Sequence, residues 1–111
     1  MAASYSGRGG PFSVWAHEDS DALAVHAVGE LDIASAPMLE KALLHALEGD
    51  ASSVMLDLAE VCFIDSMGLR TVLWAAHSSR ENGDSLRIRI GSGPVRGMVE
   101  MTCVERSLPI A

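Results

Sequence analysis

The stretch that decides the fold is Val54–Ala76, VMLDLAEVCFIDSMGLRTVLWAA. Its first part, Val54–Leu58, is almost continuously apolar, which is typical of a central strand covered on both faces. Its second part predicts a helix from about Ser66 to Asn82, because apolar residues recur at helical spacing: Leu69, Val72, Leu73 and Ala76. A hydroxyl beside a carboxylate, in the DSMG sequence of residues 65–68, stands at the start of that helix. We expect the functional site there.

Upstream of this stretch, the sequence predicts a hairpin and a helix. Residues 12–18 and 22–30 predict two strands, and their short connection makes the pair antiparallel. A helix follows, with Ser35 as its N-cap and Gly49 as its stop. This helix supplies the crossover that a buried parallel strand requires. Residues 1–11 are small, polar and Gly-rich, and we expect a flexible N-terminal tail outside the fold.

Downstream, the alternation over Leu86–Ile90 predicts a strand with one wet face, and Pro94 begins a third helix. Leu108–Ala111 is the stub of a possible last strand. The sequence therefore predicts an α/β fold with a mixed β-sheet, in which an N-terminal antiparallel hairpin is followed by βαβ units with helices packed against the sheet.

Composition excludes several classes of protein. The chain has 111 residues and a formal net charge of -7, so a phosphate backbone is repelled and nucleic acid is not an expected partner. No apolar run approaches the roughly 20 residues that span a bilayer, and no signal peptide is evident, so we expect no membrane contact and a cytoplasmic location. The two cysteines, Cys62 and Cys103, are predicted to be reduced core residues.

Enzyme and metal interpretations find little support. Gly83-Asp84-Ser85-Leu86 resembles a serine hydrolase motif, but all four histidines precede it, and it is interpreted as a helix stop and turn. A triad of Asp65, Ser66 and His77 is geometrically poor, because His77 lies about 16 Å from Ser66 along one helix. The histidines lack metal-ligand spacing, and no nucleotide-binding motif occurs. We predict no catalytic residue, metal or cofactor.

Ser66 has two interpretations. In the first interpretation, Asp65 or Ser66 is simply the N-cap of the helix, a role that stabilises it by about 1 kcal/mol. Alternatively, Ser66 carries a phosphate, which the free N–H groups and positive dipole of a helix start accommodate. Such a phosphate adds about -1.5 to -2 charges beside Asp65, so it acts as a charge switch on partner binding with little change in fold. Gly68 either admits a partner backbone or marks a tight entry into the helix.

Two further groups of residues are candidates for partner contact. Met67, Arg70, Thr71 and Trp74 are predicted on the side of the helix opposite its core stripe, where Trp and Arg favour binding, although Trp74 can equally pack under a loop. Glu30 and Asp32 are predicted on the same rim as Ser66, where they either cap the helix that starts near Ser35 or form an acidic patch for a basic partner.

These residues carry a resemblance to a known family. Gly29-Glu30-Leu31-Asp32, then VMLDL at residues 54–58 and FIDSMGL at residues 63–69, resemble the STAS domain of bacterial anti-sigma factor antagonists. The resemblance extends over about residues 12 to 110 of the predicted domain at 12–111. This sequence differs from the family in two places. Met67 stands where many members have a second small hydroxyl, and the sequence stops at Ala111, where members usually continue through a last strand and a helix.

The resemblance implies a regulator without catalytic activity. The unphosphorylated antagonist binds an anti-sigma factor that is a serine kinase and thereby frees a sigma factor. Phosphorylation of the serine matching Ser66 ends that binding, and a serine phosphatase restores it. The partner-binding residues implied or predicted together are Glu30, Asp32, Asp65, Ser66, Met67, Gly68, Arg70 and Trp74. The alternative is a structural STAS subunit of a sensory scaffold or transport complex, in which no kinase acts on Ser66.

Overall fold

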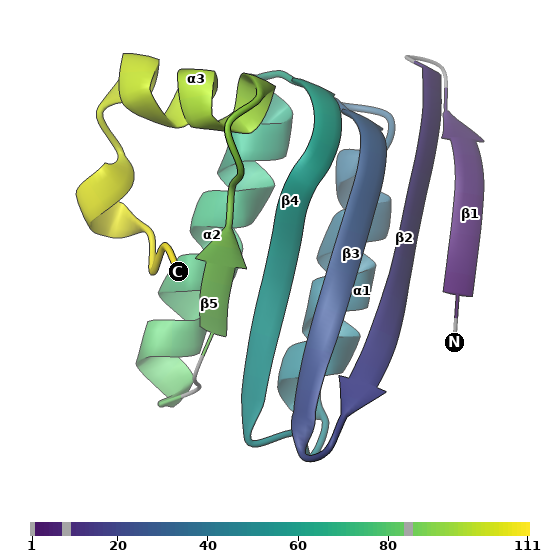
Figure 1. Ribbon diagram of the computed structural model, residues 1–111, viewed down its shortest axis with the longest axis vertical. Helices are drawn as coiled ribbons and strands as arrows, with labels where there is room; N and C mark the ends of the chain where they lie inside the picture. Colours follow the sequence, from purple (N-terminus) through teal and green to yellow (C-terminus); the bar gives the residue numbers. More distant parts are fainter. Residues whose placement is uncertain (1, 8–9, 84–85) are drawn as a thin grey trace.

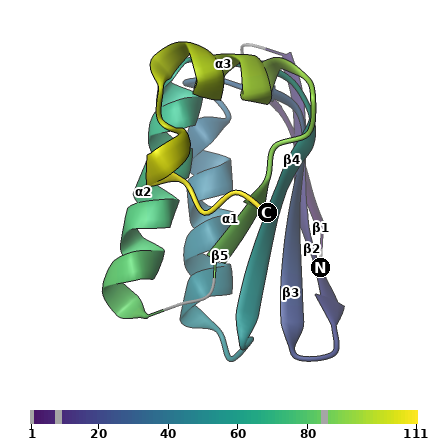
Figure 2. The ribbon, with the colours of Figure 1, turned by 60° about the vertical axis from the view of Figure 1, so that its left-hand side comes forward.

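A computed structural model of the chain describes residues 2–7, 10–83 and 86–111. Five strands form one sheet in the order β1-β2-β3-β4-β5, and two long helices cover one of its faces (Figures 1 and 2). The strands are β1 Ala2–Gly7, β2 Gly10–Asp19, β3 Ala22–Leu31, β4 Ser53–Ile64 and β5 Leu86–Arg89. The helices are α1 Ala36–Glu48, α2 Ser66–Asn82 and α3 Pro94–Thr102, followed by a 3-10 turn, η1, at Glu105–Ser107.

The topology confirms the predicted mixed sheet. β2 and β3 form an antiparallel hairpin, whereas β3, β4 and β5 are parallel neighbours joined through α1 and α2. Both crossovers step in the same direction across the sheet, and a fixed handedness of crossover then places both helices on the same face. Figure 2 shows α1 and α2 side by side on that face. The starts of both helices consequently meet at the edge where β3 and β4 end.

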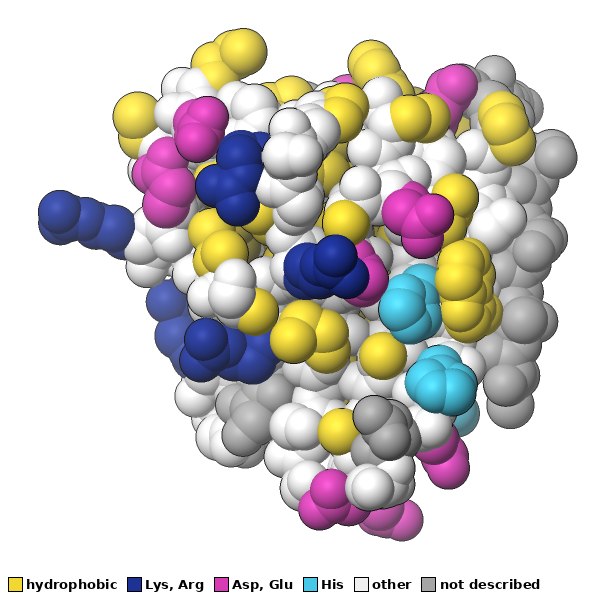
Figure 3. Space-filling model, viewed as in Figure 1, with side chains coloured by type: hydrophobic (Ala, Val, Ile, Leu, Met, Phe, Trp, Pro, Cys, Tyr) yellow, Lys and Arg dark blue, Asp and Glu magenta, His cyan; other side chains and the backbone are white. Residues whose placement is uncertain are grey.

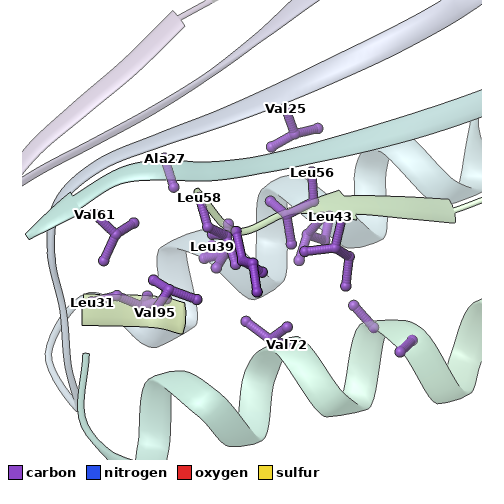
Figure 4. Close-up of a cluster of buried hydrophobic side chains, with 14 of the residues drawn as sticks. Val25, Ala27, Leu31, Leu39, Leu43, Leu56, Leu58, Val61, Val72 and Val95 are labelled. Carbon is purple, nitrogen blue, oxygen red and sulfur yellow. The ribbon is translucent and has the colours of Figure 1, made fainter. Parts of the chain in front are cut away.

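The core fills the space between the sheet and these two helices. Leu39 and Leu43 of α1 and Val72 of α2 are fully buried against the inward side chains of the central strands (Figure 4). Those strand residues include Val25, Ala27, Leu56 and Leu58. Burying each large aliphatic side chain contributes about 1.5 to 3 kcal/mol, so this single layer of contacts holds the helix starts in place.

β4 differs from its prediction in length and in burial. The strand extends to Ile64, and its residues alternate: Val54 and Leu56 are buried, whereas Met55 and Asp57 are only partly covered. Within the described residues, no helix covers the face on which Met55 and Asp57 lie. The prediction of a strand covered on both faces is therefore wrong. Met55 and Ala59 make the run look continuously apolar although they point to the open side.

The N-terminal residues also differ from their prediction. Residues 1–11 are expected outside the fold, but Ala2–Gly7 form β1 along the edge of β2 and Gly10 already belongs to β2. Residues 1, 8 and 9 lie outside the described part. Composition misses this strand because its pairing uses backbone groups that the free edge of β2 offers to any sequence.

The remaining boundaries agree with the sequence. Gly83 ends α2 in the left-handed conformation (φ 71°), which confirms the predicted helix stop, while Asp84 and Ser85 lie outside the described residues. The predicted stub at Leu108–Ala111 forms a single parallel bridge, between Ile88 and Ile110.

The two cysteines are both free, as predicted, but neither belongs to the core. Cys62 lies on β4 and Cys103 ends α3, and the side chains of both are exposed. The prediction that they are core residues is therefore wrong. Cys62 is exposed between the buried Val61 and Ile64 of β4.

Candidate functional site

Asp65 fixes the start of α2. Its backbone is extended (φ -109°, ψ -175°), and its Oδ1 accepts a hydrogen bond from the Gly68 backbone N–H at 2.9 Å. The backbone N–H of Leu69 donates to the Asp65 carbonyl at 3.0 Å. An extended residue that accepts from the third residue of the helix is an N-cap. Asp65, and not Ser66, is therefore the cap.

The other side of Asp65 ties α2 to the loop after β3. Its Oδ2 accepts a hydrogen bond from the Ile33 backbone N–H at 3.3 Å, and its own N–H donates to the Leu31 carbonyl at 3.2 Å. Figure 1 shows β3 and β4 ending at the same edge of the sheet. The prediction that the end of β3 and Ser66 share one rim is confirmed, and Asp65 is the residue that joins them.

Ser66 is the first residue of α2, and its side chain is exposed. Within the described ranges, its hydroxyl has no hydrogen-bond partner, since Asp65 supplies the cap. The first turn of α2 contains no acidic residue. The positive end of the helix dipole therefore lies at Ser66, and no acidic side chain of the first turn compensates it. Ser66 is free to be modified while the helix keeps its cap.

Asp32 closes the loop between β3 and α1. Its Oδ1 accepts hydrogen bonds from the backbone N–H groups of Ala34 at 2.9 Å and Ser35 at 3.1 Å. Only 7% of Asp32 is exposed. Neither predicted role is supported: the carboxylate bonds loop residues that precede α1 and no N–H group of α1 itself, and a carboxylate this buried cannot join an exposed acidic patch. Glu30 is partly exposed, and its carbonyl accepts from the Ser35 hydroxyl at 2.6 Å.

Ser35 stands at the N-cap position of α1, as predicted, but its hydroxyl does not cap that helix. The hydroxyl faces back into the loop, where it also accepts from the Asp32 backbone N–H at 2.9 Å. The loop therefore holds its own shape without help from a ligand. This matters for the site because Ile33, in the middle of the loop, is presented to solvent.

Gly68 is explained by packing inside the chain. A Cβ built at this position lies 2.6 Å from the Leu31 carbonyl oxygen and 2.8 Å from the Leu31 Cγ. The first turn of α2 thus approaches the end of β3 more closely than any other residue type allows. Gly68 is buried, so the interpretation of a tight entry into the helix is supported over contact with a partner backbone.

Only some of the α2 residues that were predicted to face away from the core are exposed. Met67 and Arg70 are exposed, but Thr71 is 8% exposed and its hydroxyl donates to the Met67 carbonyl at 3.3 Å. Trp74 is half-buried and packs against the core. The reason is that α2 contacts α1 as well as the sheet, so its buried face is wider than one stripe. The outward assignment of Thr71 is wrong, and Trp74 packs within the fold.

Two exposed apolar residues beside Ser66 were missed by the sequence analysis. Ile33 is 68% exposed, and Phe63, two residues before the cap, is 48% exposed. Met67, which follows Ser66, is 36% exposed, and Ile33 is tied by its backbone N–H to Asp65, so three exposed hydrophobic side chains belong to the segments next to Ser66. We call Ile33, Phe63, Ser66, Met67 and Arg70 the Ser66 rim. Such apolar side chains at a surface mark an interaction site. In the sequence, the position of Ile33 between Asp32 and Ser35 in a loop could have indicated an exposed apolar residue.

Catalytic and metal-binding arrangements do not form around Ser66. His77 pairs with Glu81 at 3.2 Å on the exposed side of α2, and the Asp65 carboxylate is occupied by backbone donors. In the part of the chain that the structure describes, no group of His, Cys, Asp and Glu side chains is placed to hold a metal ion. The geometry at Ser66 is that of an accessible hydroxyl without an adjacent base.

Removing the cap is expected to destabilise the fold measurably. Asp65→Ala loses the bond to Gly68 and the bond to Ile33, which should lower the free energy of unfolding by about 2 kcal/mol. Asp65→Asn keeps one acceptor oxygen for Gly68 but replaces the other with an NH2 group, which cannot accept from Ile33, so it should recover only about half of that loss. Urea denaturation of the three proteins checks this. Full recovery by Asn, or no loss for either variant, would show that Asp65 does not fasten α2 to the β3 loop.

Comparison with known proteins gives one family and a set of similar folds. The STAS domain family matches residues 14–111. A search among curated proteins finds no match. An anti-sigma factor antagonist from Mycobacterium paratuberculosis has a TM-score of 0.80 at 20% identity, covering 96% of this chain and 89% of its own. SpoIIAA of Bacillus in its phosphorylated form has a TM-score of 0.66 at 15% identity, covering 88% and 90%.

A third similar structure comes from a different context. A sulfate transporter family protein from Wolinella succinogenes has a TM-score of 0.69 at 16% identity, covering 85% of this chain and 79% of its own. At these identities the likeness concerns the fold. Among the described residues, no helix has both the length and the apolar character needed to cross a bilayer.

Proposed function

We propose that this chain, which belongs to the STAS domain family, is an anti-sigma factor antagonist controlled by phosphorylation of Ser66. In its unphosphorylated form it binds an anti-sigma factor that is a serine kinase, and a sigma factor is released. The observation that carries the proposal is the exposed, unbonded Ser66 hydroxyl at the first position of α2, beside a cap supplied by Asp65.

The surroundings of Ser66 suit a phosphate. The Ser66 and Met67 N–H groups belong to the first turn of α2, where backbone donors lack helical acceptors and the dipole favours an anion. Arg70 lies one turn further along the same face, at the spacing at which side chains meet, and it is exposed. A phosphate can therefore be held without any movement of β4 or α2.

The same phosphate is unfavourable for a partner. In the unphosphorylated chain, Ile33, Phe63 and Met67 offer a hydrophobic contact around a neutral hydroxyl. Phosphorylation adds about -1.5 to -2 charges in the middle of that patch, on a chain whose net charge is already -7. Closing a partner over the patch then requires desolvation of a dianion, which is costly unless the partner pairs it.

Relatives of similar fold support this assignment. SpoIIAA has been solved in an unphosphorylated and a phosphorylated form, with TM-scores of 0.66 for each against this chain. By this proposal the chain is a substrate of its kinase partner and of a serine phosphatase, and it has no catalytic activity of its own. Its place of action is the cytoplasm, where sigma factors work.

A second candidate is a STAS subunit of a transport complex or sensory scaffold. The similar fold of the sulfate transporter family protein favours this alternative. In that role the Ser66 rim is a fixed contact surface, and no phosphate is added. The two candidates make opposite predictions for Ser66 and are separated by one experiment.

The experiment incubates the chain with ATP and a cognate kinase-type anti-sigma factor, followed by peptide mass spectrometry. Phosphate is expected on the peptide containing Ser66 at close to one per chain, and none is expected on Ser66→Ala. Met67 offers no neighbouring hydroxyl, and the Ser66→Ala variant distinguishes Ser66 from Ser52 and Ser53 of the same tryptic peptide. Phosphate on a different residue, or none after complete turnover of a control substrate, would favour the structural subunit.

A further inference from the structure

The sheet face opposite α1 and α2 is uncovered within the described residues (Figure 2). Its central part is formed by β3, β4 and β5, which are parallel. All-parallel sheets are almost always covered on both faces, and the parallel part of this mixed sheet is covered on only one. Here the second face instead presents half-buried apolar side chains, including Trp15, Ala24, Val28 and Met55. This feature, remote from the chemistry of Ser66, indicates that another molecule covers the face.

One row of four side chains crosses this face. The strand registers place Trp15 of β2 beside His26 of β3, His26 beside Asp57 of β4, and Asp57 beside Arg89 of β5. The Trp15 and His26 rings stack with centroids 5.2 Å apart. The Asp57 Oδ2 lies 3.5 Å from the His26 Nδ1 and 3.4 Å from an Arg89 guanidinium nitrogen. Figure 3 shows basic, acidic, histidine and hydrophobic side chains adjoining on this face.

The side chains of this row can pair with those of the same row in a second copy, if the two rows run in opposite order. Read from β2 to β5, it runs aromatic, imidazole, carboxylate and guanidinium. When a second copy is turned by 180° about an axis parallel to the strands and between β3 and β4, Trp15 faces Arg89 and His26 faces Asp57. A guanidinium beside a Trp ring is attractive, and both residue types are favoured anchors of interfaces. A two-fold axis supplies each contact twice.

We propose that the open face binds a second copy of this chain about that two-fold axis. In the neighbouring row, His17, Ala24, Met55 and Arg87 are paired across β2 to β5, and its central pair is complementary about this axis while the axis sets His17 opposite Arg87. The same axis places Ala24 against Met55 of the other copy, an apolar contact at the centre. Two sheets packed in this way keep their strands nearly aligned, the usual arrangement of a β-sandwich.

Charge and size are compatible with this dimer. The chain as a whole is acidic, but the row holds one carboxylate and one guanidinium, so it carries no net charge that repels its copy. Asp57 and Arg89 pair inside the chain, where the Asp57 side chain is 13% exposed, whereas the Arg89 side chain is 65% exposed and presents most of its surface to a partner. The open face belongs to the broadest side of the molecule, whose extents are 32 × 30 Å. A side of this breadth has room for the roughly 800 Å² per partner that stable interfaces bury.

The first test is sedimentation equilibrium of the full chain over a range of concentrations. Wild type is expected to form dimers, and Arg89→Glu is expected to raise the dimer dissociation constant at least about tenfold, because it removes the guanidinium at both symmetric contacts. Lys41→Glu changes the charge equally on α1, on the other side of the molecule, and should dimerise like wild type. Monomeric wild type at high concentration, or dimers unaffected by Arg89→Glu, would overturn the proposal.

The second test examines the axis itself. Trp15→Lys places lysine against Arg89 of its copy and should be monomeric, as should Arg89→Glu. In a mixture of the two, the introduced lysine faces the introduced glutamate at one contact, and the native Trp15 and Arg89 meet at the other. The mixed sample is therefore expected to regain the dimer mass. Failure of two folded variants to associate on mixing would contradict this axis.

A third measurement requires no variant. The chain has two tryptophans, Trp15 on the open face and Trp74 against the core. On dilution of wild type, the indole NMR signal of Trp15 should shift while that of Trp74 stays in place. The opposite pattern, or no shift of either signal in a dimerising sample, places the interface elsewhere and refutes the proposal. The inference does not depend on the proposed function.

Discussion

Ser66→Asp is expected to weaken binding to the anti-sigma factor about tenfold, which corresponds to about 1.4 kcal/mol. The carboxylate brings one charge into the hydrophobic Ser66 rim, and the partner must desolvate it when it closes over Ile33, Phe63 and Met67. A phosphate carries nearly twice that charge, so the substitution is the milder form of the switch. Isothermal titration calorimetry with the purified partner measures the difference.

Two variants serve as controls for this result. Ser66→Ala stays neutral and should bind like wild type while resisting phosphorylation. Ser107→Asp adds the same charge at an exposed serine of η1 and should leave the affinity unchanged. The thermal midpoint of Ser66→Asp should stay near that of wild type, because a carboxylate at the first turn of a helix is favourable. Unfolding of Ser66→Asp, or an equal loss for Ser107→Asp, would contradict a local charge switch.

Gly68→Ala is expected to lower the free energy of unfolding by about 2 kcal/mol. On an exposed helix the same change stabilises by about 1 kcal/mol, because alanine is the better helix former. Here the new methyl group meets the backbone carbonyl of Leu31, which belongs to β3 and cannot move aside alone. The first turn of α2 must shift, and Ser66 shifts with it. Urea denaturation measures the stability, and the rate of phosphorylation reports the displacement.

Gly97 provides the matched comparison within the same chain. It lies in α3, and a Cβ at this position meets nothing within 4 Å. Gly97→Ala should therefore raise the free energy of unfolding by about 0.5 to 1 kcal/mol. The opposite signs at the two glycines are the prediction. If Gly68→Ala were also stabilising, the close approach of α2 to β3 would not hold the site.

The helices and inner strands could be predicted because their signals are local. Leu69, Val72 and Ala76 repeat at helical spacing, and Gly83 ends α2 where the sequence places a stop. The antiparallel hairpin followed from a connection too short for any other pairing. The joining of Glu30–Asp32 and Ser66 at one rim followed from topology, since parallel strands end at the same edge of a sheet.

The sequence could not show which side chains are covered by elements that lie far away in the chain. Thr71 looks like an outer residue of α2, and only the packing of α1 beside α2 buries it. Met55 and Asp57 look like members of a doubly covered strand, although both crossovers go to one face. Asp65 was a candidate N-cap of α2, but its second bond, from the Ile33 backbone N–H, comes from a loop 32 residues away in the sequence. Such contacts are non-local and leave no periodic signal.

The central claim is that a phosphate on Ser66 changes the charge of the rim and not the shape of the domain. The most direct measurement titrates the anti-sigma factor with one preparation of the chain before and after stoichiometric phosphorylation of Ser66. The account predicts an affinity loss of about 100-fold or more, about 2.7 kcal/mol, with a thermal midpoint within about 2 °C of the unmodified chain. Equal affinity of the two forms, or a loss accompanied by unfolding, would contradict it.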